Sequence, residues 1–396
     1  MKNYHAVERA TQLMDAFLAD LQAIVNIDSG TYTKTGVDSV GVYLRDRFQD
    51  FGFTTYFERQ QQYGDNLVAE HKGNTLAGPR ILLIGHMDTV FPEGEVERRP
   101  FAIDERDGKR VATGPGVLDM KSGLLIGMYA LLLLSEAQQT NYQSATFLFN
   151  SDEEIGSPGS KPLIQELARQ SDAVLVLEPG RTLTTVVSSR RAVGNYRVEV
   201  RGVAAHAGVE PQKGSNAILE LAHQIQALQA LNGTIPGTTL NVGIIGGGER
   251  PNVVPDFAYC EIDVRASDRK SAQAIDEAIH KVTAKTTVKG TQINLSGGML
   301  CQPFERNERN ARLVELAKAA GKDLNLEIED LSSGGGSDAN TTAALGVATL
   351  DGLGAGGGMA HNPGEYIELD YLPMRIALVS GLVQQINNYY QHGNKL

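Results

Sequence analysis

Apolar residues recur along the first part of the chain with two different spacings. Three segments have the spacing of helices: 6–26, 38–51 and 122–135. The last of these is apolar nearly all round, so we expect it to be buried. Three short apolar runs are typical of strands that are covered on both faces: 81–84, 145–150 and 173–177. Strands that alternate with helices predict an α/β domain whose mainly parallel sheet is flanked by helices.

The pattern changes after Pro179. Two segments, 195–201 and 258–265, alternate polar and apolar residues, as half-exposed antiparallel strands do. Two further strands are predicted at 239–245 and 291–296. Two helical segments, 215–231 and 269–285, lie between them, so the order is β-α-β-β-α-β. From residue 300 onward the chain returns to a helix, a strand, a Gly-rich loop and a helix. We therefore predict a discontinuous α/β domain over 1–183 and 299–396, interrupted by an inserted α+β domain over 184–298.

Composition and charge narrow the class of protein. The chain has 396 residues, with 36 Lys or Arg against 47 Asp or Glu, and its formal net charge is −11. An acidic chain is a poor partner for nucleic acid and for anionic membranes, because both require clustered cations. Hydrophobic residues make up 41 % of the chain and charged residues only 21 %, which excludes a disordered protein.

Neither export nor redox chemistry is indicated. The N-terminus has no apolar signal region, and the longest apolar stretch, Leu124–Leu134, is too short to cross a bilayer of about 30 Å. We therefore expect a cytoplasmic protein. Cys260 and Cys301 lie outside any CxxC or CxxH arrangement, so we expect two reduced thiols and no thiolate metal site.

His86 and Asp88 directly follow the predicted strand 81–84. Their side chains point the same way in an extended segment, because side chains alternate with a period of two. A carboxylate can accept a hydrogen bond from the N–H of one ring nitrogen and so orient the other nitrogen toward a metal ion. The alternative is a histidine that merely ends a strand inside the core.

Carboxylates occur at the other element ends. Asp119 comes just before the helix 122–135, where it could also be a first-turn carboxylate. The run Asp152–Glu154 follows the strand 145–150, and adjacent carboxylates repel one another unless a cation or solvent compensates. A solvated acidic turn is the alternative. Glu178 ends the last of the apolar runs, where a buried strand makes a plain surface role less convincing.

His361 follows a Gly-rich loop near the C-terminus, where it could equally be an ordinary loop histidine. The candidates together are two histidines and several carboxylates, each expected at one edge of the parallel sheet. Such nitrogen and oxygen donors suit Zn²⁺, with Co²⁺ or Mn²⁺ as competitors. A metal ion would also relieve the repulsion, and adjacent carboxylates could divide the work of ligand and general base.

With these motifs in place, the chain resembles the co-catalytic dizinc metallopeptidases of the aminoacylase and glutamate carboxypeptidase type from residue 10 to residue 390. The matching motifs are GHMDTV, GPGVLDMKSG, SDEEIGS, LEPG, AHAGVEPQKGSNA, PNVVPDFAYCEIDVR, GGGSDAN and HNPGEY. The carboxypeptidase G-like branch is the most similar, with acetylornithine deacetylases and succinyl-diaminopimelate desuccinylases as further relatives. The resemblance implies a catalytic domain in the discontinuous part and a lid and dimerisation domain in the insertion.

The resemblance assigns five ligands to two Zn²⁺ ions. Asp119 would bridge the two ions. His86 and Glu178 would complete one site, and Glu154 and His361 would complete the other.

The resemblance also assigns catalytic roles. Glu153 would be the general acid/base, which takes a proton from a water activated by both ions and returns it to the leaving nitrogen. Asp88 would orient His86. The family further leads us to expect a cis peptide bond between Asp119 and Met120.

Substrate contacts are implied in the inserted domain and the Gly-rich loop. His206 would reach the scissile carbonyl oxygen, in its own subunit or in the partner's. Asn252 and Arg265 would bind the side of the substrate's terminal carboxylate, although by position alone they could be a turn residue and a surface charge. The loop before a late helix could hold an anion or merely cap that helix, and its candidate residues are Gly335, Gly336 and Ser337.

The expected function is the release of a C-terminal amino acid from a small peptide or N-acyl conjugate by a homodimer. Glutamate-specific relatives have an Arg shortly after the lid. Here that stretch is Cys301–Phe304, and the Arg is absent or displaced to Arg306, so a strong preference for glutamate does not follow.

Other functions fit the same residues in part. An N-acyl amino acid deacylase would use identical metal chemistry with a different pocket. A non-catalytic metal-binding scaffold is a remote alternative, since fold does not fix function. A two-metal phosphatase or nuclease would require further cationic groups for phosphate.

Overall fold

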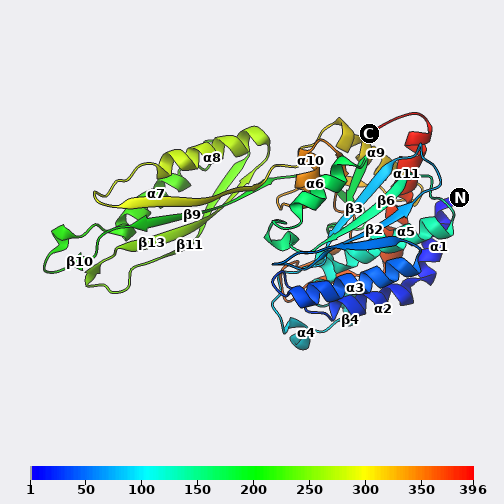
Figure 1. Cartoon of the computed structure of the whole chain (residues 1–396), viewed down its shortest axis with the longest axis horizontal. Coiled ribbons are helices and arrows are strands. Elements are labelled where there is room, and N and C mark those ends of the chain that lie inside the picture. The colour runs from blue at the N-terminus through cyan, green and yellow to red at the C-terminus, as the bar shows by residue number, and fades with distance from the viewer. Residues whose placement is uncertain (1) are drawn as a thin grey trace. The chain divides into compact units, whose positions relative to one another are not determined.

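The computed structural model describes residues 2–396 and divides them into two compact units (Figure 1). Unit 1 comprises the residues up to Ser188 together with Arg306–Ser332 and Ser337–Leu396. Unit 2 comprises Ser189–Glu305 and Ser333–Gly336. The main chain therefore leaves unit 1 after Ser188 and re-enters it at Arg306.

A six-stranded sheet with the order β1-β2-β6-β3-β7-β16 forms the centre of unit 1. Its last four strands run parallel to one another, and only β2 is antiparallel to its neighbours, β1 and β6, so the sheet is mainly parallel as predicted. The predicted apolar runs are its central strands. The bounds are β1 Thr54–Glu58, β2 Asn66–Lys72, β3 Arg80–His86, β6 Ser144–Asn150, β7 Ala173–Val176 and β16 Ala348–Leu350.

Helices cover both faces of this sheet. Ile81 and Leu83 of β3 point into one large core that also contains side chains of α1, α2, α3, α5, α9 and α11. Leu82 and Ile84 are equally buried but lie on the opposite face, on which α6 and α10 pack. The bounds are α1 Lys2–Gln12, α2 Met14–Val25, α3 Lys34–Asp50, α4 Glu95–Arg98, α5 Ser122–Glu136, α6 Lys161–Arg169, α9 Glu308–Lys322, α10 Asp338–Ala344 and α11 Leu372–Gln391.

Helices α1 and α2 differ from the sequence prediction, whereas α5 agrees with it. The single helix predicted over 6–26 is wrong, because the chain bends at Leu13 between α1 and α2; α1 packs mainly on α11, while α2 packs on α5 and the turn before it. The prediction of a buried helix at 122–135 is confirmed by α5. The span Val117–Glu136 passes a length and hydropathy test for crossing a membrane, but 89 % of its most apolar window is buried inside the structure. It is the central core helix of unit 1.

A second sheet in unit 1 brings two distant segments together. Its order is β17-β18-β5-β4, and β18 pairs with β5 so that Tyr366 lies opposite Thr113. The segment around His361 is thereby held beside the turn that leads to Asp119. No strand was predicted here, because these strands are short and mostly half exposed. The bounds are β4 Ala102–Arg106, β5 Lys109–Thr113, β17 Gly357–Gly358 and β18 Tyr366–Glu368.

Unit 2 is an antiparallel sheet of order β11-β13-β9-β14 with α7 and α8 on one face. The order along the chain is the predicted β-α-β-β-α-β. Val198 and Ile262 meet Leu221 and Ile275 in its core, which also contains the free Cys260; Cys301 is free as well. The bounds are β9 Ala192–Arg201, α7 Ala217–Gln229, β11 Thr238–Gly247, β13 Phe257–Ala266, α8 Arg269–Thr283 and β14 Gln292–Cys301.

Two short ladders complete the structure. β10 (Ala205–His206) pairs with β12 (Val253–Val254) at one end of unit 2 (Figure 1). β8 (Thr185–Arg190) pairs with β15 (Glu329–Ser333).

A buried arginine on α11 ties the loops of unit 1 together. The Arg375 side chain is 1 % exposed and donates hydrogen bonds only to backbone carbonyls. It reaches Gly354 at 2.7 Å and Leu183 at 2.7 Å, and it also contacts the carbonyls of Leu353, Thr185 and Gly352. Burial lowers its pKa to about 10. One side chain thus joins α11 to the loop after β16 and to the segment before β8.

Replacing this arginine should destabilise unit 1 strongly. Arg375→Met keeps much of the volume but leaves several buried carbonyls without donors, so we expect a loss of about 3–5 kcal/mol. Urea unfolding followed by circular dichroism measures the change. The control Arg110→Met removes an arginine whose side chain is 62 % exposed and should change stability by less than about 0.5 kcal/mol. Equal losses in the two variants would contradict this account.

Candidate metal centre

His86 is the hub of a cluster of polar side chains at the carboxyl edge of the main sheet. It ends β3 and is 1 % exposed. Its Nδ1 lies 2.9 Å from the backbone carbonyl oxygen of Asp88. Its Nε2 lies 3.2 Å from Asp119 Oδ1 and 3.7 Å from Glu178 Oε1. The Nδ1 contact orients the ring so that Nε2 faces the two carboxylates.

The Asp88 carboxylate contacts more than the histidine. Its Oδ1 lies 3.4 Å from His86 Nδ1 and accepts the backbone N–H of Glu153 at 3.1 Å, while its Oδ2 accepts the backbone N–H of Glu154 at 3.2 Å. The Thr31 hydroxyl donates to it at 2.7 Å. Asp88 therefore holds the turn on which both glutamates stand. Neither Thr31 nor these backbone contacts could be predicted from the sequence, because both depend on loops that meet only in three dimensions.

His361 approaches the same carboxylates from the other side. Its Nε2 lies 3.1 Å from Asp119 Oδ2 and 3.2 Å from Glu154 Oε2. Asp119 thus contacts one histidine with each of its two oxygens. The peptide bond between Asp119 and Met120 is cis, as expected. The structure brings together all five side chains that the sequence analysis named as ligands.

The donor set fits divalent metal ions. Ligand atoms of His86, Glu153 and Glu178 lie within 4.8 Å of one another, as do those of His86, Asp119 and Glu154. The buried Glu154 Oε1 has no hydrogen-bond donor within residues 2–396, so a cation would satisfy an oxygen that no described protein group satisfies. Imidazole nitrogens and carboxylate oxygens are both common ligands of divalent metal ions in proteins.

Only two of the three adjacent carboxylates face this cluster. Asp152 turns toward the start of α6, where it accepts the N–H groups of Gly159 and Ser160. Burial, and then the charge of Glu178, raise the pKa of Glu153 well above its ordinary value. Glu153 and Glu154 therefore still repel each other, because both carboxylates face the same buried cluster.

The two histidines and Asp119 shift one another's protonation. Hydrogen bonds that His361 donates to the carboxylates of Asp119 and Glu154 raise its pKa to about 10. Burial by itself would raise the pKa of Asp119, but hydrogen bonds to His361 and His86 outweigh it and lower that pKa. The cluster therefore attracts positive charge, whether as protons on the imidazoles or as metal ions that replace those protons.

Glu365 supports the turn before Asp119. Its carboxylate accepts the backbone N–H groups of Leu118 at 2.7 Å, Asp119 at 2.9 Å and Gly116 at 3.3 Å. Burial raises its pKa to about 7. This glutamate belongs to the HNPGEY motif, but the motif by itself predicts no role for it. Its only signal was its position four residues after His361.

Unit 2 separates the candidate substrate residues into two groups. Exposed His206 and Asn252 are neighbours, since His206 pairs with Val253 and the Ala207 N–H donates to the Asn252 carbonyl at 3.0 Å. The His206 Nδ1 accepts the Gly208 N–H at 3.2 Å, which leaves Nε2 as the donor. Arg265 lies near the other end of β13, a strand of 10 residues and therefore roughly 30 Å long.

Arg265 is already held by a carboxylate. Its Nε and Nη2 donate to the two oxygens of Asp263 at 2.9 and 2.8 Å. Arg306, the candidate for the displaced arginine, lies in unit 1, where it pairs with Asp330 and donates to the Ser188 hydroxyl at 2.9 Å.

The Gly-rich loop is also partly engaged. In unit 2, Arg190 donates to the carbonyls of Gly335 at 3.1 Å and Gly336 at 3.5 Å. In unit 1, Ser337 is the N-cap of α10 and its hydroxyl donates to Asp351 at 2.6 Å. The capping role is therefore present, and anion binding by this loop stays a prediction.

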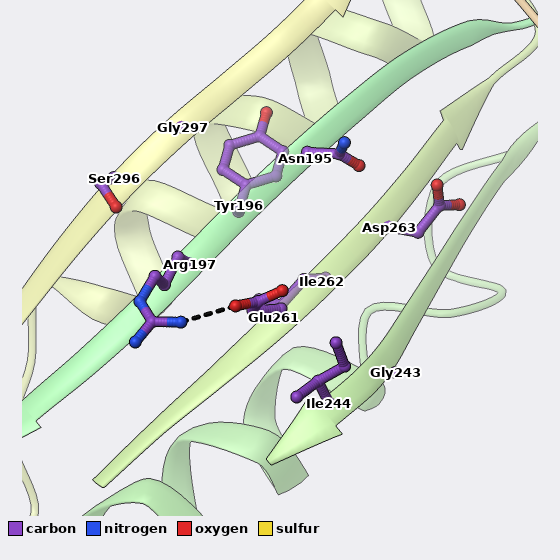
Figure 2. A pocket seen from close by; sticks show the side chains of 10 residues that line it. All are labelled: Asn195, Tyr196, Arg197, Gly243, Ile244, Glu261, Ile262, Asp263, Ser296 and Gly297. Carbon is purple, nitrogen blue, oxygen red and sulfur yellow. Dashed lines mark hydrogen bonds and ion pairs between the residues drawn. The ribbon is translucent and has the colours of Figure 1, made fainter. Parts of the chain in front are cut away.

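Two hollows differ in their relation to the cluster. A pocket of about 440 Å³ in unit 1 reaches the candidate ligand Glu154. Its lining residues are Gly30, Thr31, Tyr32, Thr33, Thr89, Val90, Phe91, Pro92, Glu93, Glu154 and Ile155. Figure 2 shows the other, a hollow of about 370 Å³ on the open face of the unit 2 sheet, where Arg197 pairs with Glu261. No residue predicted for the site lines this second hollow.

Comparison with known proteins agrees with the geometry. Residues 82–385 match the description of peptidase family M20/M25/M40. The chain is 30 % identical to carboxypeptidase G2 of Pseudomonas sp. (strain RS-16), over 96 % of this chain and 91 % of that protein. It is 26 % identical to acetylornithine deacetylase of Erwinia tasmaniensis, over 87 % of this chain and 89 % of that protein. The solved structure of a tripeptidase of Staphylococcus aureus has the same fold, with a TM-score of 0.80 and 22 % sequence identity. The match covers 95 % of this chain and 99 % of that one. The chain therefore belongs to peptidase family M20/M25/M40 and is a metal-dependent hydrolase.

Proposed function

We propose that the chain hydrolyses an amide bond with two Zn²⁺ ions and releases a C-terminal amino acid from a small peptide or N-acyl conjugate. The observation that supports this most directly is the position of Asp119, whose two oxygens contact His86 and His361 separately. One carboxylate can thus bridge two ions. Glu178 would complete the ion at His86, and Glu154 the ion at His361.

Glu153 is the proposed general acid/base. Bound divalent ions supply Lewis acidity, which lowers the pKa of water and polarises an amide carbonyl. Glu153 stands beside the ligand atoms of His86 and Glu178, within 4.8 Å. Its raised pKa suits a group that accepts a proton from water and then donates it to the leaving nitrogen. Asp88 keeps Glu153 in place through the backbone N–H.

The pocket beside Glu154 is the proposed site for the acyl side of the substrate. Tyr32, Val90 and Phe91 present aromatic and apolar surface, and no Lys or Arg belongs to its lining. Such a pocket favours a neutral, bulky acyl group over succinyl, which would bring an unpaired carboxylate. It is also larger than an acetyl group needs. These features favour the carboxypeptidase-like function over a succinyl-specific deacylase.

The alternative is an N-acyl amino acid deacylase of the acetylornithine deacetylase or succinyl-diaminopimelate desuccinylase type, supported by the similarity to such a deacetylase. A substrate panel at one pH separates the two functions: N-benzoyl-glutamate, a dipeptide, N-acetylornithine and N-succinyl-diaminopimelate. We expect kcat/KM to be at least about tenfold higher for the benzoyl compound, because an apolar pocket discriminates by about 1–3 kcal/mol. A preference for the succinyl or acetyl compound would establish the alternative.

Substitution should separate the two adjacent glutamates. Glu153→Ala should keep its zinc and lose at least about 10²-fold in kcat, because a general acid/base contributes that much. Glu154→Ala should instead lower the zinc content. Metal analysis and steady-state kinetics measure both effects, and Glu166→Ala, at an exposed position on α6, is the control. A Glu153→Ala variant with near-normal kcat would refute this assignment.

Unit 2 is the proposed lid and dimerisation domain. β11 is an edge strand of its sheet, and Ile244 and Ile245 on it are 51 % and 62 % exposed. Ile218 and Leu219 on the adjacent α7 are also exposed. Exposed apolar side chains along an unpaired strand edge favour pairing with a second copy of this chain. We propose a homodimer through this surface.

The separation within unit 2 favours a shared active site. His206 and Asn252 lie at one end of the unit and Arg265 near the other, about 30 Å apart along β13. One small substrate cannot contact both groups from the same copy of unit 2. We therefore propose that His206 donates from Nε2 to the scissile carbonyl oxygen in the partner's site, as in other oxyanion holes.

Mixing inactive variants tests the shared site. Subunits with Glu153→Ala and subunits with His206→Ala should each be inactive alone. A mixture refolded or exchanged together should recover about a quarter of wild-type kcat, because half of random dimers are mixed and each of these has one complete site. Size-exclusion chromatography with light scattering confirms that dimers form. Dimers that recover no activity would show that His206 acts within its own subunit.

A further inference from the structure

Glu365 makes an unusual set of contacts for a buried carboxylate. The side chain is fully buried, at 0 % exposure. Oε1 accepts two backbone N–H groups, from Leu118 and Asp119, and Oε2 accepts that of Gly116. Hydrogen bonds to a carboxylate are stronger than neutral ones, and three of them on one turn restrict how that turn can move. Both oxygens face the backbone of this turn, and Glu365 belongs to neither group of side chains that could hold a metal ion.

The strand register explains why Glu365 can reach this turn. Tyr366 of β18 lies opposite Thr113 of β5, so Glu365 stands where the ladder ends and the chain continues toward Asp119. The Glu365 N–H also donates to the Asn362 carbonyl at 2.9 Å, which closes the turn that begins at His361. Glu365 is therefore bonded both to the turn that contains Asp119 and to the turn that begins at His361.

We propose that Glu365 is a positioning residue that holds Asp119 and His361 in register for the metal ions. This inference rests on the proposed two-metal site. Asp119 accepts from both histidines only if its backbone is placed correctly between them. Partners of metal ligands that are not ligands themselves typically change metal affinity or activity by about 10–100-fold when mutated.

Glu365→Gln tests the proposal. The substituted amide has about the same volume but places an NH₂ donor against backbone N–H donors, so at least one hydrogen bond is lost. We expect the affinity for Zn²⁺ to fall by about 10–100-fold, measured at whichever of the two ion positions binds Zn²⁺ less tightly. Competition between the purified full-length enzyme and a chromophoric chelator, with Zn²⁺ as the probe, measures this. The matched control is Glu368→Gln, three residues later on β18, whose carboxylate pairs with Lys109 at 2.8 Å. It should bind Zn²⁺ as the wild type does.

A second measurement separates positioning from general stabilisation. Thermal unfolding is recorded with excess Zn²⁺ and with a chelator for the wild type and both variants. Ligand binding raises the stability of the folded state according to its affinity, so a weakened site reduces the difference in Tm between the two conditions. A positioning role therefore predicts a smaller difference in Glu365→Gln. A role in folding alone lowers both Tm values equally and overturns the proposal.

The outcomes also distinguish this inference from the proposed function. A wild type that binds no Zn²⁺ would refute the two-metal site itself. A wild type that binds two ions, with an affinity in Glu365→Gln unchanged within about twofold, would refute only the positioning role. If Glu365→Gln does not fold, Glu365→Asp keeps the charge with a shorter reach and should show an intermediate affinity. Failure of both variants to fold would overturn the proposal, because Glu365 would then serve the fold as a whole.

Discussion

The parallel pairing of β3 with its two neighbours is the constraint on which the metal centre depends. In this register His86 lies opposite Asn150 of β6, and Ile84 lies opposite Val176 of β7. The three strands therefore end at one edge of the sheet, and the acidic turn and Glu178 follow there. A shift of two residues in either pairing would move a glutamate by about 7 Å along the strand axis, out of reach of His86.

Two buried carboxylates hold the backbone around this edge, and one of them, Asp88, also lies 3.4 Å from His86 Nδ1. Asp88 accepts the N–H groups of Glu153 and Glu154, and Glu365 accepts those of the turn at Asp119. Burying a negative charge is costly unless donors compensate, and backbone N–H groups at a turn are donors that are already fixed in place. The ligands thus stand on turns that are ordered by other carboxylates, which is how a site can be organised before metal or substrate binds.

Periodicity predicted the elements whose burial is uniform. The central strands and α5 are apolar on every side, so the sequence pattern and the structure agree. The small sheet around β18 was not predicted, because its strands are short and its pairing partner is distant in the chain. The bend at Leu13 was missed for a related reason: the apolar pattern continues through it, and only packing on α11 and α5 separates the two helices. The spacing of apolar residues along the chain shows that a segment is buried, but it does not show which other segment covers it.

The sequence by itself determined the family and which side chains meet, because candidate ligands such as His86 and Glu178 lie at or just after the ends of strands that share one edge. Only the tertiary structure decided what holds those ligands. The role of Glu365 could not be read from the chain, because its partners are backbone N–H groups, which every residue except proline possesses. The separation of His206 from Arg265 within unit 2 likewise follows from strand pairing. Residue types identify the chemistry of a site, but only the fold shows which backbone N–H groups lie close enough to hold its side chains in place.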